Sequence, residues 1–243
     1  MTERSDALGA APAYVPQSPW GPTAAVAVAI LASLVPAIAV TAAVAWINLD
    51  GPRSLSSPLL LAQMTAGQIL SLLLIWWAAG RGGMRAQVLR LRPVRETPAL
   101  AAVGFGLLLV AAIAPVELLL YRLAGLDLFT DGRWLLEGLR SDLWWGVVFA
   151  AVVLAPLWEE LTFRGFLLSA LAKSRLGFWP GAAISSLLWT GLHAGYSWPG
   201  LVSVFLAGLG LAWIMKRTGS MKAVVIAHAA INAFALAVVS TFA

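Results

Sequence analysis

The sequence predicts an all-α protein, a polytopic transmembrane helical bundle of about seven spans, and three observations support this fold class. Hydrophobic residues make up 60% of the 243 residues and charged residues only 11%, whereas soluble domains average about 45–50% and about 25%. The apolar residues are gathered in long runs, each close to the roughly 20 residues that a helix needs to cross a bilayer. The 12 tryptophans suit anchoring at the membrane–water interfaces.

Seven apolar runs follow one another along the chain, and each predicts one span. The first run is too long for the apolar core of a signal peptide, about 7–15 residues, so we expect a retained anchor. The predicted spans cover residues 23–47, 58–80, 98–122, 143–171, 180–195, 199–216 and 222–242. We therefore expect three parts: a disordered amino-terminal tail (1–20), three accessory spans with their loops (21–142) and a core of four spans (143–243).

The distribution of Arg and Lys predicts an orientation in the membrane. Five arginines lie in the loop between the second and third predicted spans, and cytoplasmic loops are enriched in Arg and Lys. Alternation of the spans then places the basic residues near Lys173 and Lys216 on the same side, while the more acidic stretch 123–142 falls outside. We therefore expect the amino terminus in the cytoplasm and the carboxyl terminus outside.

Composition and short motifs exclude several classes of protein. The chain has no cysteine, which excludes disulfides, thiolate metal sites and cysteine nucleophiles. Its net charge of +5 is explained by loop Arg and Lys, and the clustered basic face that nucleic-acid binding needs is missing. The sequence contains no G-x-S-G or G-x-G-D motif of serine or aspartyl intramembrane proteases, and no phosphate-binding or dinucleotide fingerprint.

A few ionisable groups remain inside the predicted spans, where each costs about 2.5–3.5 kcal/mol on insertion scales and so marks a candidate functional site. Glu160 and Arg164 are four residues apart, so they share a helix face and can form an ion pair. Glu159 is turned by about 100° from Glu160, so Arg164 can neutralise one carboxylate while the other stays available. Pro156, just upstream, can bend the helix and open room for water.

Two further pairs of polar or aromatic residues have the same spacing: Trp189 with His193, and His228 with Asn232. The two histidines are the only ones in the chain. If the fourth and fifth spans are antiparallel neighbours, Glu159 and His193 lie level, each about 21 Å from the hairpin that joins the two helices. The last span brings its own pair to the same depth only if that hairpin protrudes into the cytoplasm.

A carboxylate, two histidines and an amide in an apolar cavity suit the hydrolysis of an amide bond by an activated water. A carboxylate can act as general base on the water, and a histidine can share that role or deliver a proton. A second histidine, together with an asparagine, can stabilise an oxyanion. A glutamate and two histidines also match the three-ligand set of catalytic zinc, so Glu159, His193 and His228 are candidate zinc ligands. The residues alone leave both kinds of water activation open.

Three motifs in order carry a resemblance to a known family. They are Glu159-Glu160-x-x-x-Arg164, Trp189-x-x-x-His193 and His228-x-x-x-Asn232. Together they resemble the motifs of the CAAX protease and bacteriocin-processing (CPBP, or Abi) family of intramembrane proteases. The resemblance covers roughly residues 143–242, so it implies a protease core in the final four spans.

The resemblance also implies roles for the residues and a site that opens towards the cytoplasm. Glu159 would activate the water with help from His193, while His228 and Asn232 would bind the oxyanion or a metal. The other two charged residues of the first motif would support the site. The family usually has phenylalanine where this chain has Trp189, a difference that we expect to alter only the shape of the pocket.

We therefore expect an intramembrane endopeptidase that cuts a membrane-associated protein or peptide, in the plasma (inner) membrane of a prokaryote. Its partners would be that substrate and the lipid bilayer, with no nucleic acid, and zinc is the one candidate cofactor. A non-catalytic immunity or scaffold protein is an alternative, which loss of motif residues would favour; all three motifs are present. A proton-coupled transporter is another, since buried Glu and His suit proton relays, but the inverted repeats typical of transporters are not apparent.

Overall fold

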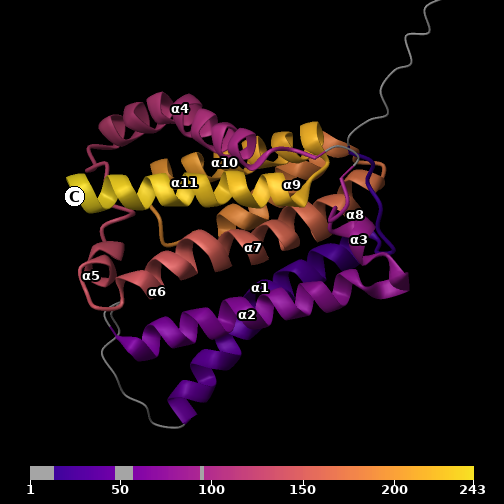
Figure 1. Ribbon diagram of the computed structural model, residues 1–243, viewed down its shortest axis with the longest axis horizontal. Coiled ribbons are helices and arrows are strands. Elements are labelled where there is room, and N and C mark those ends of the chain that lie inside the picture. Colours follow the sequence, from indigo (N-terminus) through magenta and orange to yellow (C-terminus); the bar gives the residue numbers. More distant parts are fainter. Residues whose placement is uncertain (1–13, 47–56, 94–95) are drawn as a thin grey trace, which may run out of the picture.

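The computed structural model describes residues 14–46, 57–93 and 96–243, and these residues form helices and turns without a strand (Figure 1). Six helices in the described ranges are long and apolar enough to cross a membrane. They are α1 (Pro22–Trp46), α2 (Pro58–Ala79), α4 (Ala99–Ala124), the composite helix Trp144–Lys173, α10 (Trp198–Thr218) and α11 (Met221–Phe242). The shorter helices are η1 (Arg81–Gly83), α3 (Arg85–Val88), α5 (Leu135–Leu139) and α9 (Phe178–Gly191). The predicted all-α polytopic bundle is therefore confirmed, and the chain is an integral multi-pass membrane protein.

The fifth predicted span, residues 180–195, is too short to be a complete crossing, so the expected number of seven is corrected to six. Helix α9 has 14 residues, which rise only about 21 Å against a hydrocarbon core of about 30 Å. The chain then turns through residues 192–196 before α10 begins. Gly191 at the end of α9 and Gly195 within the turn weaken the helix, and Ser197 caps the start of α10 with its side chain. His193 therefore lies in the turn and not inside a helix.

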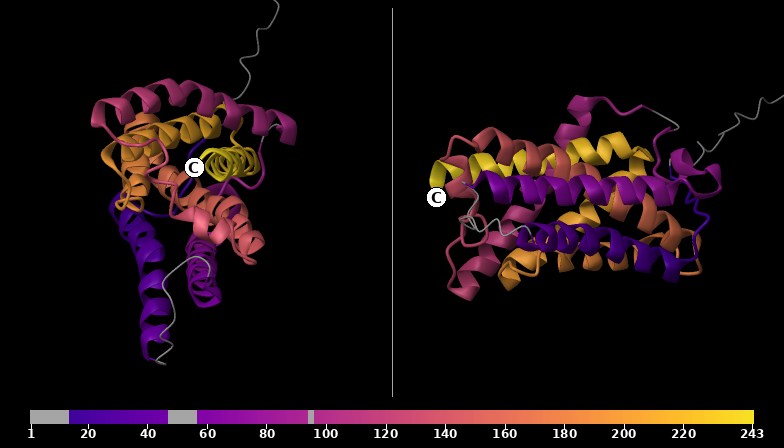
Figure 2. Two further views of the ribbon diagram at one scale, coloured as in Figure 1. Left: turned by 90° about the vertical axis from the view of Figure 1, so that its left-hand side faces the viewer. Right: turned by 90° about the horizontal axis from the view of Figure 1, so that it is seen from below.

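The composite helix Trp144–Lys173 is the centre of the bundle (Figure 2). In its most apolar 18-residue stretch 56% of the residues are buried, compared with 11–39% in the corresponding stretches of the other five candidate spans. Its winding changes along its length, in five segments. These are α6 (Trp144–Phe149), the π-helical η2 (Ala150–Leu154), α7 (Ala155–Glu160), the π-helical η3 (Leu161–Leu167) and α8 (Leu168–Lys173). Single π-helical turns inside α-helices are often found at functional sites, and the two here flank α7, which ends with the adjacent glutamates.

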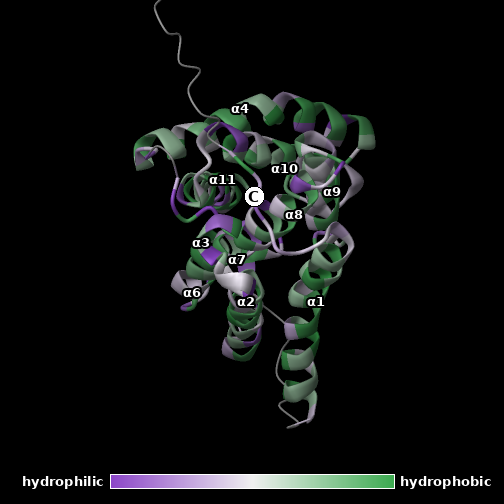
Figure 3. Cartoon of the chain, turned by 90° about the vertical axis from the view of Figure 1, so that its right-hand side faces the viewer, coloured by the Kyte–Doolittle hydropathy of each residue, from purple (hydrophilic) through white to green (hydrophobic). Residues whose placement is uncertain are grey.

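The remaining helices pack on two sides of this central helix (Figure 2). Helices α1 and α2 lie next to each other on one side, while α4, α10 and α11 cover the other. Gly106 of α4 lies against the backbone of Ala227 in α11, where a Cβ would collide with the carbonyl oxygen. Small residues allow such close helix contacts in membranes. Apolar residues dominate the outer surfaces of α1 and α4 (Figure 3), as lipid-facing surfaces require.

The described end of the expected amino-terminal tail is packed against the bundle, which corrects the prediction of disorder there. In residues 14–20, the Tyr14 side chain is only 8% exposed, and its hydroxyl lies 3.4 Å from Ser169 Oγ of α8. The guanidinium of Arg90 lies over the same ring at 5.3 Å. Burial of an aromatic ring outweighs the polar composition of the segment. Residues 1–13, the rest of the expected tail, lie outside the described residues.

Candidate active site

Glu160 is the centre of a buried charged cluster. Its side chain is fully buried, and Arg164 Nη1 donates a hydrogen bond to its Oε1 at 3.0 Å. His228 Nδ1 of α11 lies 2.7 Å from the same oxygen. The guanidinium of Arg164 also donates, through Nη2, to the carbonyl of Gly208 in α10 at 3.3 Å. The ion pair predicted from the four-residue spacing is therefore present, and a histidine from a distant helix joins it.

The contact between Glu160 and His228 requires that the end of α8 extends beyond the start of α11. Glu160 lies about 20 Å along its helix from Lys173, whereas His228 lies only about 10 Å from Met221 at the start of α11. The end of α8 therefore extends roughly 10 Å beyond the start of α11. Residues 14–20 and the short helix α3 cover this extension, since Ser169 Oγ donates to the carbonyl of Val88 at 3.0 Å.

Glu159 has a different environment from its neighbour. Its Oε2 accepts a hydrogen bond from Trp189 Nε1 at 2.6 Å, and His228 Nε2 lies 4.0 Å from the same oxygen. The Glu159 side chain keeps 11% exposure, whereas that of Glu160 has none. Since Arg164 is paired with Glu160, the charge of Glu159 is not neutralised by that arginine, as the spacing predicts.

Trp189 does more than change the shape of the pocket, which corrects the expectation drawn from the resemblance. Its indole N–H holds Glu159, a bond that phenylalanine cannot form. The His193 and His228 rings pack against the indole in T-shaped arrangements, at centroid distances of 5.2 and 5.3 Å. The guanidinium carbon of Arg164 lies 4.3 Å from the indole centroid, a cation–π geometry. Trp189 therefore contacts residues of all three motifs.

Replacing Trp189 by phenylalanine is expected to lower the free energy of unfolding by about 1–3 kcal/mol, because a buried carboxylate oxygen loses its donor. The fold should be kept, since an aromatic ring remains between the histidines. Reversible unfolding in mixtures of SDS and mild detergent measures the change. A Trp77→Phe variant is the control, because Trp77 is 73% exposed on α2. Equal losses in the two variants would contradict the role of the indole N–H.

The structure brings His193 to the edge of the site. The residue is half-buried in the turn after α9, and its Nδ1 lies 3.1 Å from the carbonyl of Trp189. A carbonyl can only accept, so Nδ1 carries the hydrogen and Nε2 is left as the acceptor of a neutral ring. His193 therefore keeps one ring nitrogen for chemistry.

Asn232 is bound to the backbone of the central helix and not to the histidines or glutamates of the site. Ala155 N–H bonds to the carbonyl of Ala150, five residues back. The next donor in that π-helical pattern would be Pro156, which has no N–H. The carbonyl of Ala151 is thereby freed, and Asn232 Nδ2 donates to it at 2.8 Å. The amide of Asn232 and the Nδ1 of His228 are thus engaged with different partners on the central helix, the carbonyl of Ala151 and the carboxylate of Glu160.

The three candidate zinc ligands are not gathered into a metal site. Within the described ranges, no three side chains of His, Cys, Asp and Glu lie close enough to hold an ion. Glu159 approaches His228, but Nδ1 of that histidine is bonded to Glu160. His193 faces the backbone of α9 through its own Nδ1. In this arrangement the three residues do not fit a zinc ion.

Two residues at the site had no role in the prediction from sequence. The ring of Tyr196 meets the His193 ring at 5.3 Å, and burial raises the pKa of Tyr196 to about 12, with the carboxylates of Asp131 and Glu159 adding to the rise. Gly208 of α10 lies where a Cβ would be 3.2 Å from Arg164 Nη2, so it leaves space for the guanidinium. The only feature of the sequence that could have indicated Tyr196 is its position, three residues after His193.

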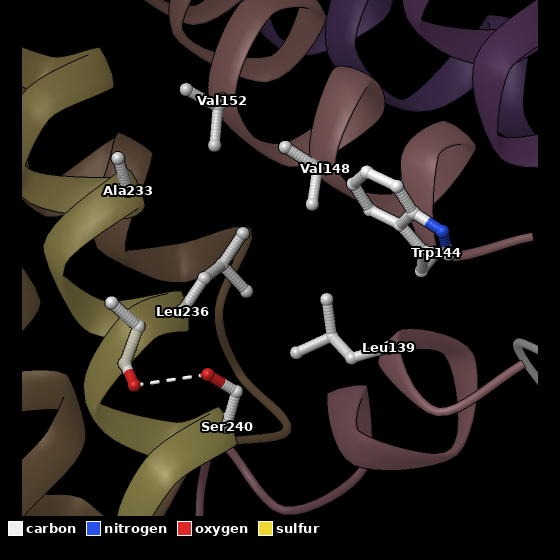
Figure 4. A pocket seen from close by; sticks show the side chains of 8 residues that line it. Leu139, Trp144, Val148, Val152, Ala233, Leu236 and Ser240 are labelled. Atoms are coloured by element: carbon white, nitrogen blue, oxygen red, sulfur yellow. Dashed lines mark hydrogen bonds between the residues drawn. The ribbon is translucent and has the colours of Figure 1, made fainter.

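An apolar cavity of about 360 Å³ lies between α5, the central helix and α11 (Figure 4). Its lining residues are Leu139, Trp144, Val148, Val152, Ala233, Leu236, Ala237 and Ser240. Val152 and Ala233 adjoin the bonded pair Ala151 and Asn232 in the sequence. The cavity therefore lies between the same two helices that bring Glu160 and His228 together.

The fold and the site together define a multi-pass membrane protein with a buried Glu–Arg–His cluster. Residues 140–234, which include all three motifs, match the model of a family described as "Type II CAAX prenyl endopeptidase Rce1-like". This match agrees with the resemblance seen in the sequence to the CAAX protease and bacteriocin-processing family, and it covers less than half of the chain.

Two curated relatives are similar to parts of this chain. UPF0177 protein YajF of Lactococcus lactis subsp. lactis (strain IL1403) is 37% identical over 77 residues, 32% of this chain and 36% of the relative. UPF0177 protein YxdF of the same strain is 28% identical over 82 residues, 34% of this chain and 44% of the relative. The matches thus span less than half the length of these relatives. No solved structure matches the chain.

Proposed function

We propose that this protein is an intramembrane endopeptidase that hydrolyses a peptide bond of a membrane-associated protein or peptide with a water activated by Glu159. The observation that carries the proposal is the unequal environment of two adjacent carboxylates. Glu160 is fully buried and paired with Arg164, while Glu159 keeps some exposure and is held by an indole N–H. Two carboxylates with such different surroundings suit a division between support and chemistry.

Glu159 takes a proton from the attacking water as its oxygen forms a bond to the carbonyl carbon of the scissile peptide. The carbonyl oxygen becomes an oxyanion in this step. When the oxyanion collapses to re-form the carbonyl and the C–N bond breaks, Glu159 gives this proton to the leaving amine nitrogen. Glu159 is suited to both transfers because the hydrogen bond from Trp189 fixes one carboxylate oxygen and so orients the other.

His228 supplies the second group of the mechanism. The Glu160 carboxylate, paired with Arg164, can only accept, so the 2.7 Å contact places the hydrogen on His228 Nδ1. A histidine held by a carboxylate through Nδ1 has a fixed ring orientation, and its positive charge is stabilised. Nε2 then lies 4.0 Å from Glu159, where protonated His228 can donate to the oxyanion. His193, with Nε2 as an acceptor, assists from the turn after α9.

Incorporation of heavy oxygen tests this function directly. The purified protein is reconstituted in liposomes with detergent-extracted bacterial membrane proteins, in water enriched in ¹⁸O. Hydrolysis is expected to give new carboxyl termini that carry one ¹⁸O atom, which mass spectrometry detects. A parallel reaction with a chelator, followed by added zinc, shows whether cleavage depends on a metal.

The control for this assay is the same mixture without the protein. Labelled termini at equal abundance in the two mixtures would contradict the proposal. A folded protein that produces no such termini from any membrane extract would favour the non-catalytic immunity or scaffold alternative.

A further inference from the structure

A single carboxylate outside the site ties three separate segments together. Asp131, in the connection between α4 and α5, accepts hydrogen bonds from the backbone N–H of Ser197 at 2.8 Å and from its hydroxyl at 2.7 Å. Tyr121 of α4 donates its hydroxyl to the same carboxylate. Asp131 is 66 residues from Ser197 in the sequence, so the contact fixes a connection that is otherwise distant from the site.

The packing around Asp131 shows that the contact is close and specific. Gly200, in the first turn of α10, lies so near that a Cβ would collide with the Asp131 carboxylate. The first turn of a helix presents unpaired N–H groups and favours a negative charge. Ser197 is also the cap of α10, and its hydroxyl accepts from Gly200 N–H at 3.4 Å. Asp131 therefore holds the start of α10 through its cap residue.

The segment held by Asp131 is the turn that carries His193. Tyr196 precedes the bonded Ser197, and its ring packs against the His193 ring in a T-shaped arrangement. His193 in turn contacts the indole of Trp189, which holds the candidate base. A continuous series of contacts thus leads from Asp131 to Glu159.

The turn has little rigidity of its own. Gly191 ends α9 and Gly195 lies inside the turn, and glycine loses more conformational freedom on folding than any other residue. The backbone bonds of the segment are local, such as those from His193 N–H to Thr190 and from Tyr196 N–H to His193. A fixed point at the far end of the turn is therefore needed to keep the His193 ring in one place.

We propose that Asp131 is a positioning residue: it fixes the turn 192–197 and so holds the His193 ring against Trp189, beside Glu159. The consequence for catalysis rests on the proposed function, whereas the effect on the His193 ring does not. Loss of the carboxylate frees Ser197 and lets the turn sample other conformations.

Histidine NMR tests this role, because the chain has only two histidines. In protein with ¹³C-labelled histidine, a His193→Gln variant assigns the two ring signals. The Asp131→Ala variant is expected to shift or broaden the His193 signal and to leave that of His228 in place. Asp127→Ala is the matched control, since Asp127 lies in the same connection and its side chain bonds to near neighbours in sequence, Phe129 and Arg133. An unchanged His193 signal in Asp131→Ala would overturn the proposal.

A milder variant covers the case in which Asp131→Ala does not fold. Ser197→Ala removes the hydroxyl donor but keeps the backbone N–H bond to Asp131. It is expected to shift the His193 signal less, and an unchanged signal there would again overturn the proposal.

Cleavage measurements separate this inference from the proposed function. Misplacement of a group by about 1 Å can lower a rate by about 100-fold, so Asp131→Ala is expected to reduce turnover by about 10–100-fold with little change in KM. Turnover equal to that of Asp127→Ala would contradict the catalytic part of the inference. If the wild-type protein cleaves nothing while the His193 signal responds as expected, the proposed function fails and the positioning role stands.

Discussion

Replacing Glu159 by glutamine is expected to abolish peptide-bond cleavage while the protein stays folded. Glutamine has nearly the same size, and its carbonyl oxygen can still accept the hydrogen bond from the Trp189 indole. It cannot take a proton from water, and loss of a general base typically lowers a rate by about 10²–10⁴-fold. The initial rate of ¹⁸O-labelled terminus formation in proteoliposomes measures the effect.

A second intramembrane glutamate provides the control for this variant. Glu117 is half-buried in α4, on a different helix from the site. Glu117→Gln also removes one carboxylate from a candidate span, but it is expected to cleave at close to the wild-type rate. Retention of more than about a tenth of the wild-type rate in Glu159→Gln would rule out Glu159 as the base.

Replacing Arg164 by methionine is expected to destabilise the protein by about 3–5 kcal/mol, because it leaves a fully buried carboxylate without its counter-ion. Arg164 and Glu160 have side-chain exposures of 1% and 0%, so water cannot take the place of the missing partner. Methionine is unbranched and keeps most of the packing volume. The free energy of unfolding in SDS and detergent mixtures measures the loss.

The double variant Glu160→Gln/Arg164→Met separates the unpaired charge from lost packing. Glutamine removes the negative charge and keeps an oxygen that can accept from His228 Nδ1. Replacement of a whole buried ion pair is often close to neutral, so the double variant is expected to recover most of the stability. If it is as unstable as Arg164→Met alone, packing and not charge explains the effect.

Composition and run length were enough to predict the bundle, because a bilayer sets both the length and the apolarity of each span. They could not predict where α9 ends, since residues 180–195 read as one apolar run but contain glycines that weaken the helix. The burial of Tyr14 was also beyond prediction. Its partner Ser169 is 155 residues away, and no local pattern indicates such a contact.

Within the site, the pairs at helical spacing could be predicted and the contacts between helices could not. The Glu160–Arg164 bond follows from four-residue spacing on one helix. The bond between Glu160 and His228, 68 residues apart, depends on how far α8 extends beyond the start of α11. That distance could not be predicted from the sequence. Asn232 has the spacing that would place it beside His228 on one helix face. Its amide instead donates to the carbonyl of Ala151, which Pro156 leaves without a backbone donor.

The π-helical winding of η2 decides which of the two glutamates faces which partner. A π-helical turn accommodates one more residue than an α-helical turn, and one residue corresponds to about 100° around a helix axis. If residues 150–154 were wound as ordinary α-helix, Glu159 would take the angular place that Glu160 occupies relative to α11. Glu160 would then be turned about 100° further around the helix axis, away from His228. The local winding upstream, and not the side chains themselves, assigns one carboxylate to the charged cluster and leaves the other available.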